Sequence, residues 1–393
     1  MNQVRFGVIG LGNMGTSHIK YLTAGKVKGA VLTAICDIDP AKIEKAKEIA
    51  ADAAAFATFD ELIDSGLVDA IIVAVPHYLH PPMAIAAMKK GIHTLIEKPA
   101  GVYTKAVYEM NEVAKASDVQ FGIMYNQRTN PKYAKMREMV QNGELGDLKR
   151  LTWIITDWYR TQSYYNSGGW RATWAGEGGG VLTNQCPHNL DLWQWIAGMP
   201  CKISAHCHVG KWHDIEVEDD VTAYFEYENG ATGVFITTTG ECPGTNRLEI
   251  SGSKGKLTYE KGELRYVKLG VDEREFNAND TTGFGTPEKT EEIIEVEGTE
   301  TAHAGITQNF TNAILHGTPL LAPGIEGVNG LNLSNAMYLS SWLNQPIDLP
   351  VDPELYWAEL QKRIATSKTD KKVVQIDADM ESSYNDTTKL KKQ

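Results

Sequence analysis

The chain has few cysteines, and the five that it contains follow no regular spacing: Cys36, Cys186, Cys201, Cys207 and Cys242. An odd and irregular set does not suit a disulfide framework, so it favours free thiols in a reducing compartment. The sequence also lacks a secretory signal, and no apolar run approaches the roughly 18 residues that span a bilayer. These absences predict a cytoplasmic protein.

Positive charge is also scarce. Lysine and arginine number 38 against 50 aspartates and glutamates, which gives a net charge of −12. Such a balance argues against nucleic acid or an anionic membrane surface as a partner. The stretch from Cys201 to His213 holds several histidines and cysteines, but they lack the spacing of a metal site, and neighbouring residues of a strand point to opposite faces. We therefore predict no metal site, and we find no Ser-His-Asp motif.

The length and the alternation of patterns indicate two domains. With 393 residues, of which 42% are hydrophobic and 22% charged, the chain is too long for one ordinary core. Over residues 1–126, short apolar runs alternate with helical patterns, and the later runs are Asp69–Val75, Ile92–Ile96 and Val119–Tyr125. Six strands that alternate with helices predict a doubly wound parallel sheet, that is, a Rossmann domain.

A glycine-rich turn follows the first strand, Val4–Ile9, and opens the first helix. With Asp37 at the end of the second strand, about 20 residues on, this context is typical of a dinucleotide site. The glycines allow a tight turn and a close approach of a pyrophosphate to the helix N-terminus. Asp37 would bind the ribose hydroxyls and repel a 2′-phosphate, which favours NAD over NADP. The residues of the turn expected to bind the cofactor are Gly10, Gly12, Asn13, Met14 and Gly15.

Polar residues follow two later strands at the edge where an open parallel sheet binds its ligands. Pro76-His77 follows the strand at 69–75, and Glu97-Lys98 follows the strand at 92–96. A lysine at such an edge can reach a reacting group that the cofactor brings there. His80 is interpreted as a capping or surface histidine rather than a catalyst. Besides the glycine turn and Asp37, the residues of this domain expected beside the cofactor are Pro76, His77, His80, Glu97, Lys98 and Asn126.

Residues 127–393 are assigned to a second, α+β domain. Helices are predicted over Pro131–Gln141, Ala302–Leu315 and Glu326–Leu343, a polar loop over 270–290, and a loosely held tail after about Thr366. The predicted strands are Leu151–Trp158, Lys202–Val209, Val221–Tyr227, Thr232–Thr238, Arg247–Ser251 and Lys256–Glu260. Alternating polarity in these strands indicates a mostly antiparallel sheet with one covered and one open face. Because an open face commonly packs against a copy of itself, we predict a homodimer or homotetramer.

The densest polar chemistry lies between the first two strands of this domain. Trp158 to Tyr165 combines aromatic and polar side chains, and Trp170-Arg171 follows. Aromatic faces beside amide and guanidinium donors suit a carbohydrate ring, although single residues could equally be half-buried aromatics of the sheet. Asn184 and His188 are four residues apart and would share a helix face if Pro187 lies in the first turn. A lone histidine near a helix start is usually structural, so its role depends on further evidence.

Four motifs, taken in this order, resemble the glucose–fructose oxidoreductase / inositol dehydrogenase / MocA family. They are the turn at 10–15, Val75-Pro76-His77 with His80, Glu97-Lys98-Pro99, and the segment from Gly178 to Asp191. The resemblance covers nearly the whole chain and implies a nucleotide-binding domain followed by an open-faced sheet domain. It also implies a nicotinamide-dependent oxidation or reduction at one carbon of a sugar, polyol or related compound. The family's lysine corresponds to Lys98, its histidine to His188, and its Trp-Arg pair near the cofactor to Trp170-Arg171.

Two positions depart from the family pattern. His77 stands where relatives often have Asn, and Asn184 stands where they often have Asp. Without that carboxylate, His188 loses a possible proton partner, and an inositol dehydrogenase becomes a weaker expectation. The pattern Asn-x-Cys-Pro-His is similar to that of subgroups that act on glucosides or other pyranosides, including oxidation at the third ring carbon.

We therefore expect reversible hydride transfer between NAD and a secondary hydroxyl or ketone. Histidine, with an ordinary pKa near 6.5, is poised to move the hydroxyl proton, whereas lysine, near 10.4, is a poor base unless its pKa is lowered. This favours His188 as acid and base and Lys98 as donor or polariser, with the reverse left open, while Asn184 binds a neighbouring hydroxyl. The residues expected to contact substrate are Lys98, Arg128, Tyr159, Tyr165, Asn184 and His188.

Two other functions stay open. A glycoside-cleaving enzyme that retains NAD would oxidise, eliminate and reduce in turn, and it would need an extra base, for which Tyr159, Tyr165 and His303 are candidates. An NAD-binding sensor or scaffold without catalysis is the second, and the presence of Lys98 together with His188 argues against it.

Overall fold

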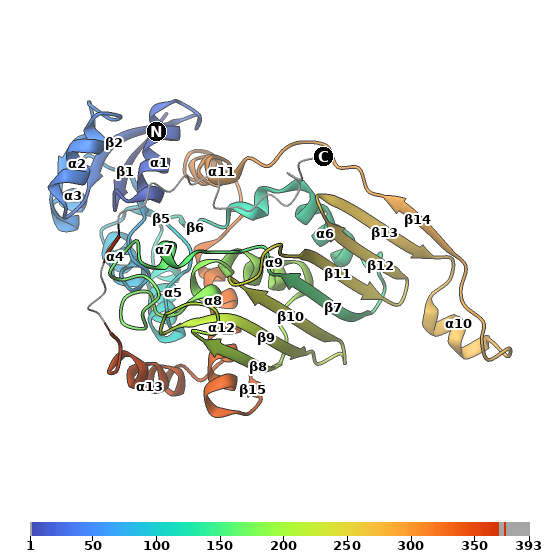
Figure 1. The fold of residues 1–393 in the computed structure, drawn as a ribbon. Coiled ribbons are helices and arrows are strands. Elements are labelled where there is room, and N and C mark those ends of the chain that lie inside the picture. The colour runs from blue at the N-terminus through green and yellow to red at the C-terminus, as the bar shows by residue number, and fades with distance from the viewer. Residues whose placement is uncertain (1, 369–372, 375–393) are drawn as a thin grey trace, which may run out of the picture. The chain divides into compact units, whose positions relative to one another are not determined.

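The computed structural model describes residues 2–368 and 373–374, and its internal contacts divide the chain into two compact units (Figure 1). Unit 1 comprises Met1–Asn130, Thr299–Leu331 and Pro353–Trp357, and unit 2 comprises Pro131–Gly298, Asn332–Asp352 and Ala358–Gln393. The sequence predicts a single boundary, after residue 126. In the structure the chain returns to unit 1 twice, at Thr299–Leu331 and at Pro353–Trp357. Most of the predicted loose tail lies outside the described residues.

Unit 1 contains a parallel sheet of six strands in the order β3-β2-β1-β4-β5-β6, which confirms the Rossmann prediction. The strands are β1 (Val4–Ile9), β2 (Ala30–Cys36), β3 (Ala54–Phe56), β4 (Ala70–Val73), β5 (His93–Ile96) and β6 (Phe121–Ile123). The central strands are almost wholly buried, because helices cover both faces of such a sheet.

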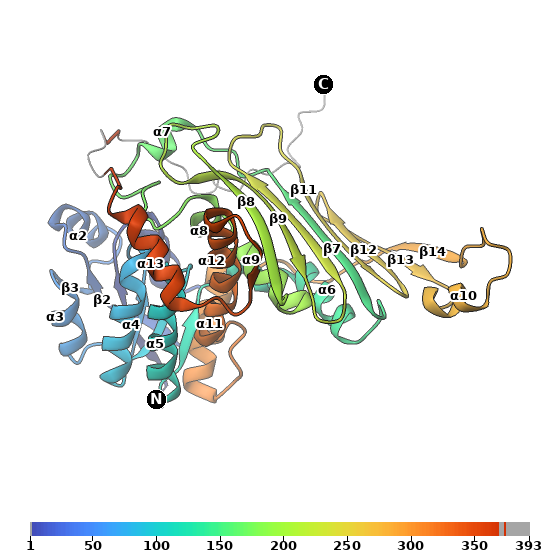
Figure 2. The ribbon, with the colours of Figure 1, turned by 90° about the horizontal axis from the view of Figure 1, so that it is seen from below.

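The helices of unit 1 are α1 (Asn13–Thr23), α2 (Pro40–Lys47), α3 (Phe59–Asp64), α4 (His80–Lys89), α5 (Thr104–Lys115) and α11 (Ala302–His316), with short 3-10 turns η1 (His77–Leu79), η2 (Asn126–Thr129) and η3 (Gly324–Glu326). Helix α1 connects β1 to β2, toward one edge of the sheet, and α4 connects β4 to β5, toward the other edge. Because both crossovers are right-handed, the two helices lie on opposite faces of the sheet. Helix α4 lies beside α5, as Figure 2 shows, and α11 lies beside α1. Helix α3 begins with a capping box between Thr58 and Glu61.

The return of the chain to unit 1 has a physical cause in the packing of α11. Phe310 of this helix is buried, and its ring lies 6.4 Å from that of Phe6 on β1. Beyond α11, the N–H of Ile123 on β6 donates to the carbonyl oxygen of Ala322 at 3.1 Å. Residues 299–331 thus complete the core of the Rossmann domain, although they are far from it in sequence.

Unit 2 contains a mixed sheet of nine strands, mostly antiparallel, in the order β14-β13-β12-β11-β7-β10-β9-β8-β15. The strands are β7 (Leu148–Ile155), β8 (Lys202–Val209), β9 (Glu218–Glu226), β10 (Thr232–Thr238), β11 (Asn246–Gly252), β12 (Gly255–Glu260), β13 (Glu263–Leu269), β14 (Lys289–Ile293) and β15 (Ile347–Asp348). Among these described strands, only the central pair β7 and β10 is parallel. The six predicted strands are all present within a few residues, and β13, β14 and β15 were not predicted.

The helices that begin in unit 2 are α6 (Pro131–Gln141), α7 (Gln162–Tyr165), α8 (Val181–Asn184), α9 (Pro187–Ala197) and α10 (Glu273–Asn279), while α12 (Gly327–Leu343) and α13 (Pro353–Ile364) contain residues of both units. Helices α6 and α9 lie on one face of the sheet (Figure 2). Trp193 of α9 is buried there, with its ring 4.8 Å from that of Phe225 on β9. Helix α10 falls in the predicted loop, where none of its residues is buried.

The described residues contain no helix that is long and apolar enough to cross a membrane.

Candidate active site

The glycine turn after β1 has the geometry that a pyrophosphate site requires. Gly10 has a φ of 86°, and a Cβ there would lie 2.3 Å from the carbonyl oxygen of Ala74. A Cβ on Gly15 would lie 1.8 Å from the carbonyl oxygen of Gly10, whereas a Cβ on Gly12 would meet no described atom within 4 Å. The outer glycines therefore serve the fold, and the middle one leaves open space before the N-terminus of α1, where anions bind.

Asp37 stands directly after β2, as predicted, and its carboxylate is fixed. The N–H of Leu11 donates to Oδ2 at 2.7 Å, and the N–H of Asp39 donates to Oδ1 at 2.9 Å. The next residue, Ile38, is 89% exposed, an apolar surface on which an adenine ring can pack. A carboxylate for the ribose and an apolar side chain for the base, both beyond the end of β2, fit the adenosine half of a dinucleotide.

Lys98 follows β5 and is half-buried, while its neighbour Glu97 is buried within unit 1. Oε1 of Glu97 lies 2.7 Å from Nε2 of His18, and Nδ1 of His18 lies 2.7 Å from the hydroxyl of Tyr21. Burial alone would raise the pKa of Glu97, but the hydrogen bond and charge of His18, with smaller contributions from His303 and Lys98, lower it to about 2. The carboxylate next to Lys98 is therefore ionised and held in one orientation.

His80 is not at the surface, which corrects the sequence interpretation. It is completely buried at the start of α4. Nδ1 lies 2.7 Å from the carbonyl oxygen of Pro99, and Nε2 lies 2.8 Å from that of Val75. The ring thus lies between the segments that follow β4 and β5 and contacts a carbonyl oxygen of each. His77, in η1, is also buried, with its ring 6.0 Å from that of His80.

Asn126 and Arg128 lie in η2 and are both buried. The Arg128 guanidinium donates to the carbonyl oxygen of Leu321 at 3.0 Å and to the Glu326 carboxylate at 2.6 Å. These contacts join η2 to the segment that returns to unit 1. The substrate contact expected of Arg128 stays a prediction.

In unit 2, a buried carboxylate fixes the glycine run that precedes Asn184. Glu218 of β9 accepts hydrogen bonds from the N–H groups of Gly180 and Leu182, both at 2.9 Å, and from the Tyr338 hydroxyl at 2.7 Å. A Cβ on Gly180 would lie 1.9 Å from the carbonyl oxygen of Glu218, so only glycine allows this approach. Burial raises the pKa of Glu218 to about 7, although the hydrogen bonds from Tyr338, Leu182 and Gly180 oppose the rise.

Asn184 and His188 belong to two successive helices rather than to one. Asn184 ends α8, and Pro187 opens α9 at its first position, where its missing N–H costs no helical hydrogen bond. His188 follows in the first turn of α9 and is 3% exposed. Pro187 thus lies in a first turn, which was the condition set for a shared helix face, but Asn184 then belongs to the preceding helix, so the two residues do not lie on one helix.

The structure adds a carboxylate that the sequence analysis did not single out. Glu177, immediately before the glycine run, is 1% exposed. Its carboxylate accepts a hydrogen bond from the N–H of Ala172 at 2.6 Å and another from the side-chain amide of Asn184. Arg171 lies beside it, with a nitrogen 3.6 Å from Oε1. The sequence held one signal for Glu177, an acidic residue directly before three glycines. A charge that is buried in such a turn needs specific partners, so this position could have been singled out.

The aromatic residues of the predicted sugar site differ in exposure. Tyr159 is 41% exposed, whereas Tyr165 is buried with its hydroxyl 2.6 Å from Oγ1 of Thr239. The Arg171 guanidinium lies over the rings of Tyr164 and Trp170, at 4.4 and 4.8 Å from their centroids. These two rings hold the Arg171 guanidinium in its position beside Glu177. Whether Tyr159, Tyr165, Trp170 or Arg171 contacts a ligand stays a prediction.

His303, the third candidate for an extra base, lies in unit 1 at the start of α11. Its ring lies 5.9 Å from that of His18. Burial lowers the pKa of His303 to about 4, although the charge of Glu97 opposes this shift. The ring is therefore neutral near pH 7.

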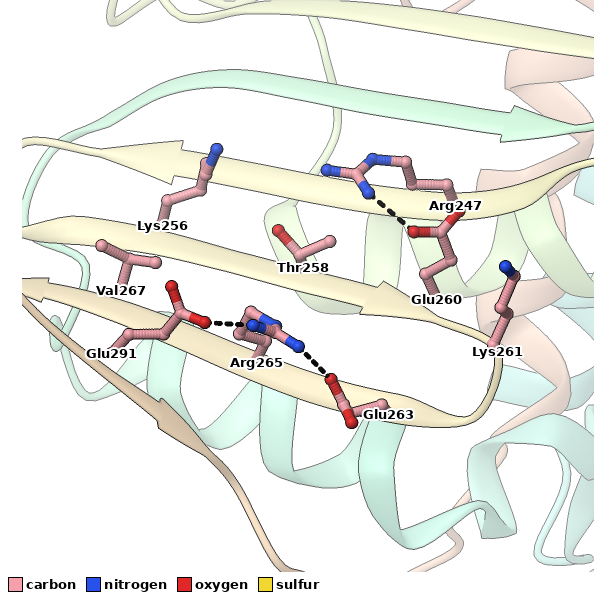
Figure 3. A pocket seen from close by; sticks show the side chains of 9 residues that line it. All are labelled: Arg247, Lys256, Thr258, Glu260, Lys261, Glu263, Arg265, Val267 and Glu291. Atoms are coloured by element: carbon pink, nitrogen blue, oxygen red, sulfur yellow. Dashed lines mark hydrogen bonds and ion pairs between the residues drawn. The ribbon is translucent and has the colours of Figure 1, made fainter.

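A shallow depression on the sheet of unit 2 contains none of the predicted site residues (Figure 3). Its side chains are mostly charged and form ion pairs with one another. Arg247 lies 2.7 Å from Glu260, and Arg265 lies 2.6 Å from Glu263. Among residues 2–368 and 373–374, no group of three or more His, Cys, Asp or Glu side chains could hold a metal ion.

Known protein families match segments of both units. A family model described as an oxidoreductase family with an NAD-binding Rossmann fold matches residues 4–125, and one described as the GFO/IDH/MocA C-terminal domain matches residues 133–258. The chain is 33% identical over 289 residues to an inositol 2-dehydrogenase from Pseudarthrobacter chlorophenolicus, a match that covers 69% of this chain and 81% of that protein. It is 29% identical over 238 residues to an inositol 2-dehydrogenase from Corynebacterium glutamicum, a match that covers 58% of this chain and 64% of the relative's length.

Two further similarities bear on function. The WlbA dehydrogenase from Chromobacterium violaceum, solved with NADH and UDP-GlcNAcA, has a TM-score of 0.77 and 26% identity, covering 90% of this chain and 97% of that one. A glycosyl hydrolase family 109 protein from Shewanella amazonensis is 31% identical over 157 residues, which covers 38% of this chain and 34% of that protein.

Fold and turn geometry together define a dinucleotide-binding protein with a Rossmann domain and an open-faced sheet domain. The chain belongs to the GFO/IDH/MocA oxidoreductase family, and its Rossmann domain binds NAD.

Proposed function

We propose that this protein transfers a hydride reversibly between NAD and a secondary hydroxyl or ketone of a sugar, glycoside or cyclic polyol. One observation carries the proposal. Lys98 follows β5 at the same edge of the sheet as the glycine turn after β1, with only β4 between these strands. An amine placed beside a dinucleotide site can act on the hydroxyl whose carbon exchanges hydride. The inositol 2-dehydrogenases and the WlbA dehydrogenase among the relatives support a hydroxylated ring as substrate.

The bound NAD supplies the acceptor for hydride, and the residues of this chain bind, orient and move a proton. Gly12 and Asp37 are proposed to hold the pyrophosphate and the ribose, with Trp170 and Arg171 as further cofactor contacts. Lys98 and His188 are proposed to share the movement of the hydroxyl proton, and Asn184 to bind a neighbouring hydroxyl. His188 is the preferred base, because an imidazole of ordinary pKa near 6.5 changes its charge near neutral pH.

The test is a panel of sugars, glucosides and inositols incubated with NAD, with NADH formation followed by its absorbance. Lys98→Ala is expected to lower turnover by about 10²–10⁴-fold, the range of acid–base catalysis. Its affinity for NADH, measured separately by fluorescence, is expected to change little. Near-normal turnover of this variant on the substrate used best by the wild type would contradict the assignment of Lys98.

A second candidate, redox-neutral cleavage of a glycoside with retained NAD, is favoured by the shorter match to the glycosyl hydrolase family 109 protein. The same panel separates the two functions. Dehydrogenation accumulates NADH in proportion to product, whereas cleavage releases the aglycone without net NADH.

We also propose that the protein is cytoplasmic and forms a homodimer or homotetramer through the open face of the unit 2 sheet. All five cysteines are free thiols, which agrees with a reducing compartment. Along β9, buried and exposed residues alternate, and the outward-facing Tyr224 is 43% exposed. Light scattering that gives the mass of a monomer at micromolar concentration would contradict the oligomer.

A further inference from the structure

The buried carboxylate of Glu177 restricts how Asn184 can be oriented. An ionised carboxylate only accepts hydrogen bonds, whereas a side-chain amide donates through its nitrogen and accepts through its oxygen. Since the Asn184 amide contacts Oε1 of Glu177, its nitrogen must face the carboxylate. The reversed amide would set two acceptor oxygens against each other in a buried place. The amide oxygen therefore points away from Glu177.

Several contacts keep the Glu177 carboxylate in place. Its second oxygen accepts from the N–H of Ala172 at 2.6 Å, and a nitrogen of Arg171 lies 3.6 Å from the first. Arg171 is itself held, because it donates to the Tyr164 hydroxyl at 2.7 Å and stacks on the Trp170 ring. A fixed donor and a nearby cation both favour the ionised form of a buried carboxyl group. Burial raises the pKa of the nearby Tyr165, and the charge of Glu177 adds to that rise, so this hydroxyl stays neutral beside the carboxylate.

We infer that Glu177 is a positioning residue that turns Asn184 into a hydrogen-bond acceptor for a substrate hydroxyl. This inference rests on the proposed function and specifies it: the hydroxyl next to the reacting carbon must donate its proton to Oδ1 of Asn184. This chain thus pairs an amide at position 184 with a buried carboxylate at position 177.

A double-mutant cycle tests the pair. Glu177→Gln keeps the shape of the side chain but removes the charge, so the Asn184 amide is no longer fixed, and kcat/KM should fall by roughly 10–100-fold, as for a misplaced contact. Asn184→Asp places two carboxylates in contact, and repulsion should raise the pKa of the pair. At low pH the shared proton replaces the amide donor, so the activity of Asn184→Asp should decline, relative to wild type, as the pH rises through the raised pKa.

The double variant Glu177→Gln/Asn184→Asp exchanges the two groups. The amide introduced at position 177 can now donate to the carboxylate introduced at position 184, and that carboxylate still presents an acceptor to the substrate. The value of kcat/KM should therefore recover to within about fivefold of wild type, and the added pH dependence should disappear. A restored buried hydrogen bond alone would recover the thermal midpoint, whereas recovery of kcat/KM together with loss of the added pH dependence requires that the pair positions an acceptor for the substrate. If the double variant is as slow as the product of the single effects predicts, the inference is wrong.

Glu218→Gln is the matched control. It is the same substitution in a second buried glutamate of this site, but Glu218 accepts from backbone N–H groups and Tyr338 rather than from Asn184. Glu218→Gln should therefore fail to rescue Asn184→Asp. Thermal midpoints and NADH affinity, measured for every variant, identify those that do not fold. Absence of turnover by the wild type on the whole panel would overturn the proposed function and the inference together, whereas an active wild type with additive variants would overturn the inference alone.

Discussion

Gly12→Ala is expected to weaken NAD binding without destabilising the protein. The added methyl group would meet no described protein atom within 4 Å, so the fold has room for it. Gly12 also has a φ of −71°, which alanine adopts without strain. The open space in front of α1 is, however, the space that a pyrophosphate needs in order to reach the N–H groups of the helix terminus. The methyl group should therefore act on the cofactor alone.

The size of the effect follows from the hydrogen bonds that the methyl group would lengthen. A hydrogen bond to a charged group contributes about 1.5–3 kcal/mol, and each 1.4 kcal/mol is a factor of about ten in Kd. Loss of one phosphate contact thus weakens NADH binding by roughly 10–100-fold, and loss of two by more. Fluorescence titration with NADH measures this change directly, and it needs no knowledge of the substrate.

Gly15→Ala provides the contrast. There a Cβ would lie 1.8 Å from the carbonyl oxygen of Gly10, so α1 must move away from β1. Overpacking of this kind costs about 1–3 kcal/mol or more, and the thermal midpoint should fall by several degrees. NADH affinity within twofold of wild type for Gly12→Ala would refute the placement of the pyrophosphate. An equal loss of thermal midpoint in both variants would refute the division of roles between these glycines.

Two further predictions concern charges in unit 1. Asp37→Asn removes the charge that repels a 2′-phosphate, while the new amide oxygen can still accept from the N–H of Leu11; affinity for NADPH relative to NADH should increase roughly tenfold or more, as measured by paired titrations. Glu97→Gln should destabilise the protein by about 3 kcal/mol at neutral pH, because a fall in pKa from 4.5 to about 2 corresponds to about that free energy. The lowered pKa of Glu97 stabilises the fold at pH values above the pKa that this group has in the unfolded chain. That stabilisation is lost as the pH falls toward 2. The difference in unfolding free energy between wild type and Glu97→Gln should therefore shrink from pH 5 to pH 3. A difference that stays constant over this range would show that ionisation of Glu97 is not its source.

The fold was largely accessible from the sequence because its signals are local. Apolar runs, the glycine turn and the alternation in β9 each lie within one element and predict its type directly. The sequence does not show that residues 299–331 belong to unit 1. Their association depends on the packing of Phe310 against Phe6, two residues that are about 300 positions apart in the sequence. Strand β13 was missed although Glu263–Leu269 alternates, and β15, with two residues, carries too little pattern to be recognised.

The candidate site divides in the same way. Lys98, Asn184 and His188 are proposed from motifs, whereas the residues that hold their neighbours carry no motif. His18 is 79 residues from Glu97 and is joined to it only by the packing of α1 against the sheet. The surface role considered for His80 was wrong for a related reason, because its two carbonyl partners lie on segments that follow different strands.

In both units, a side chain proposed to act on the substrate lies next to a buried carboxylate that other residues hold in place. In unit 1, Lys98 stands next to a buried carboxylate, Glu97, that His18 holds. In unit 2, Asn184 contacts a buried carboxylate, Glu177, that Arg171 and a backbone N–H hold. The first pair is adjacent in sequence and is visible as a motif. Six residues, the first three of them glycines, separate Glu177 from Asn184, so the second becomes a pair only in the folded chain. The carboxylate that faces Asn184 therefore comes from a residue seven positions earlier, and only the folded chain shows that the two side chains meet.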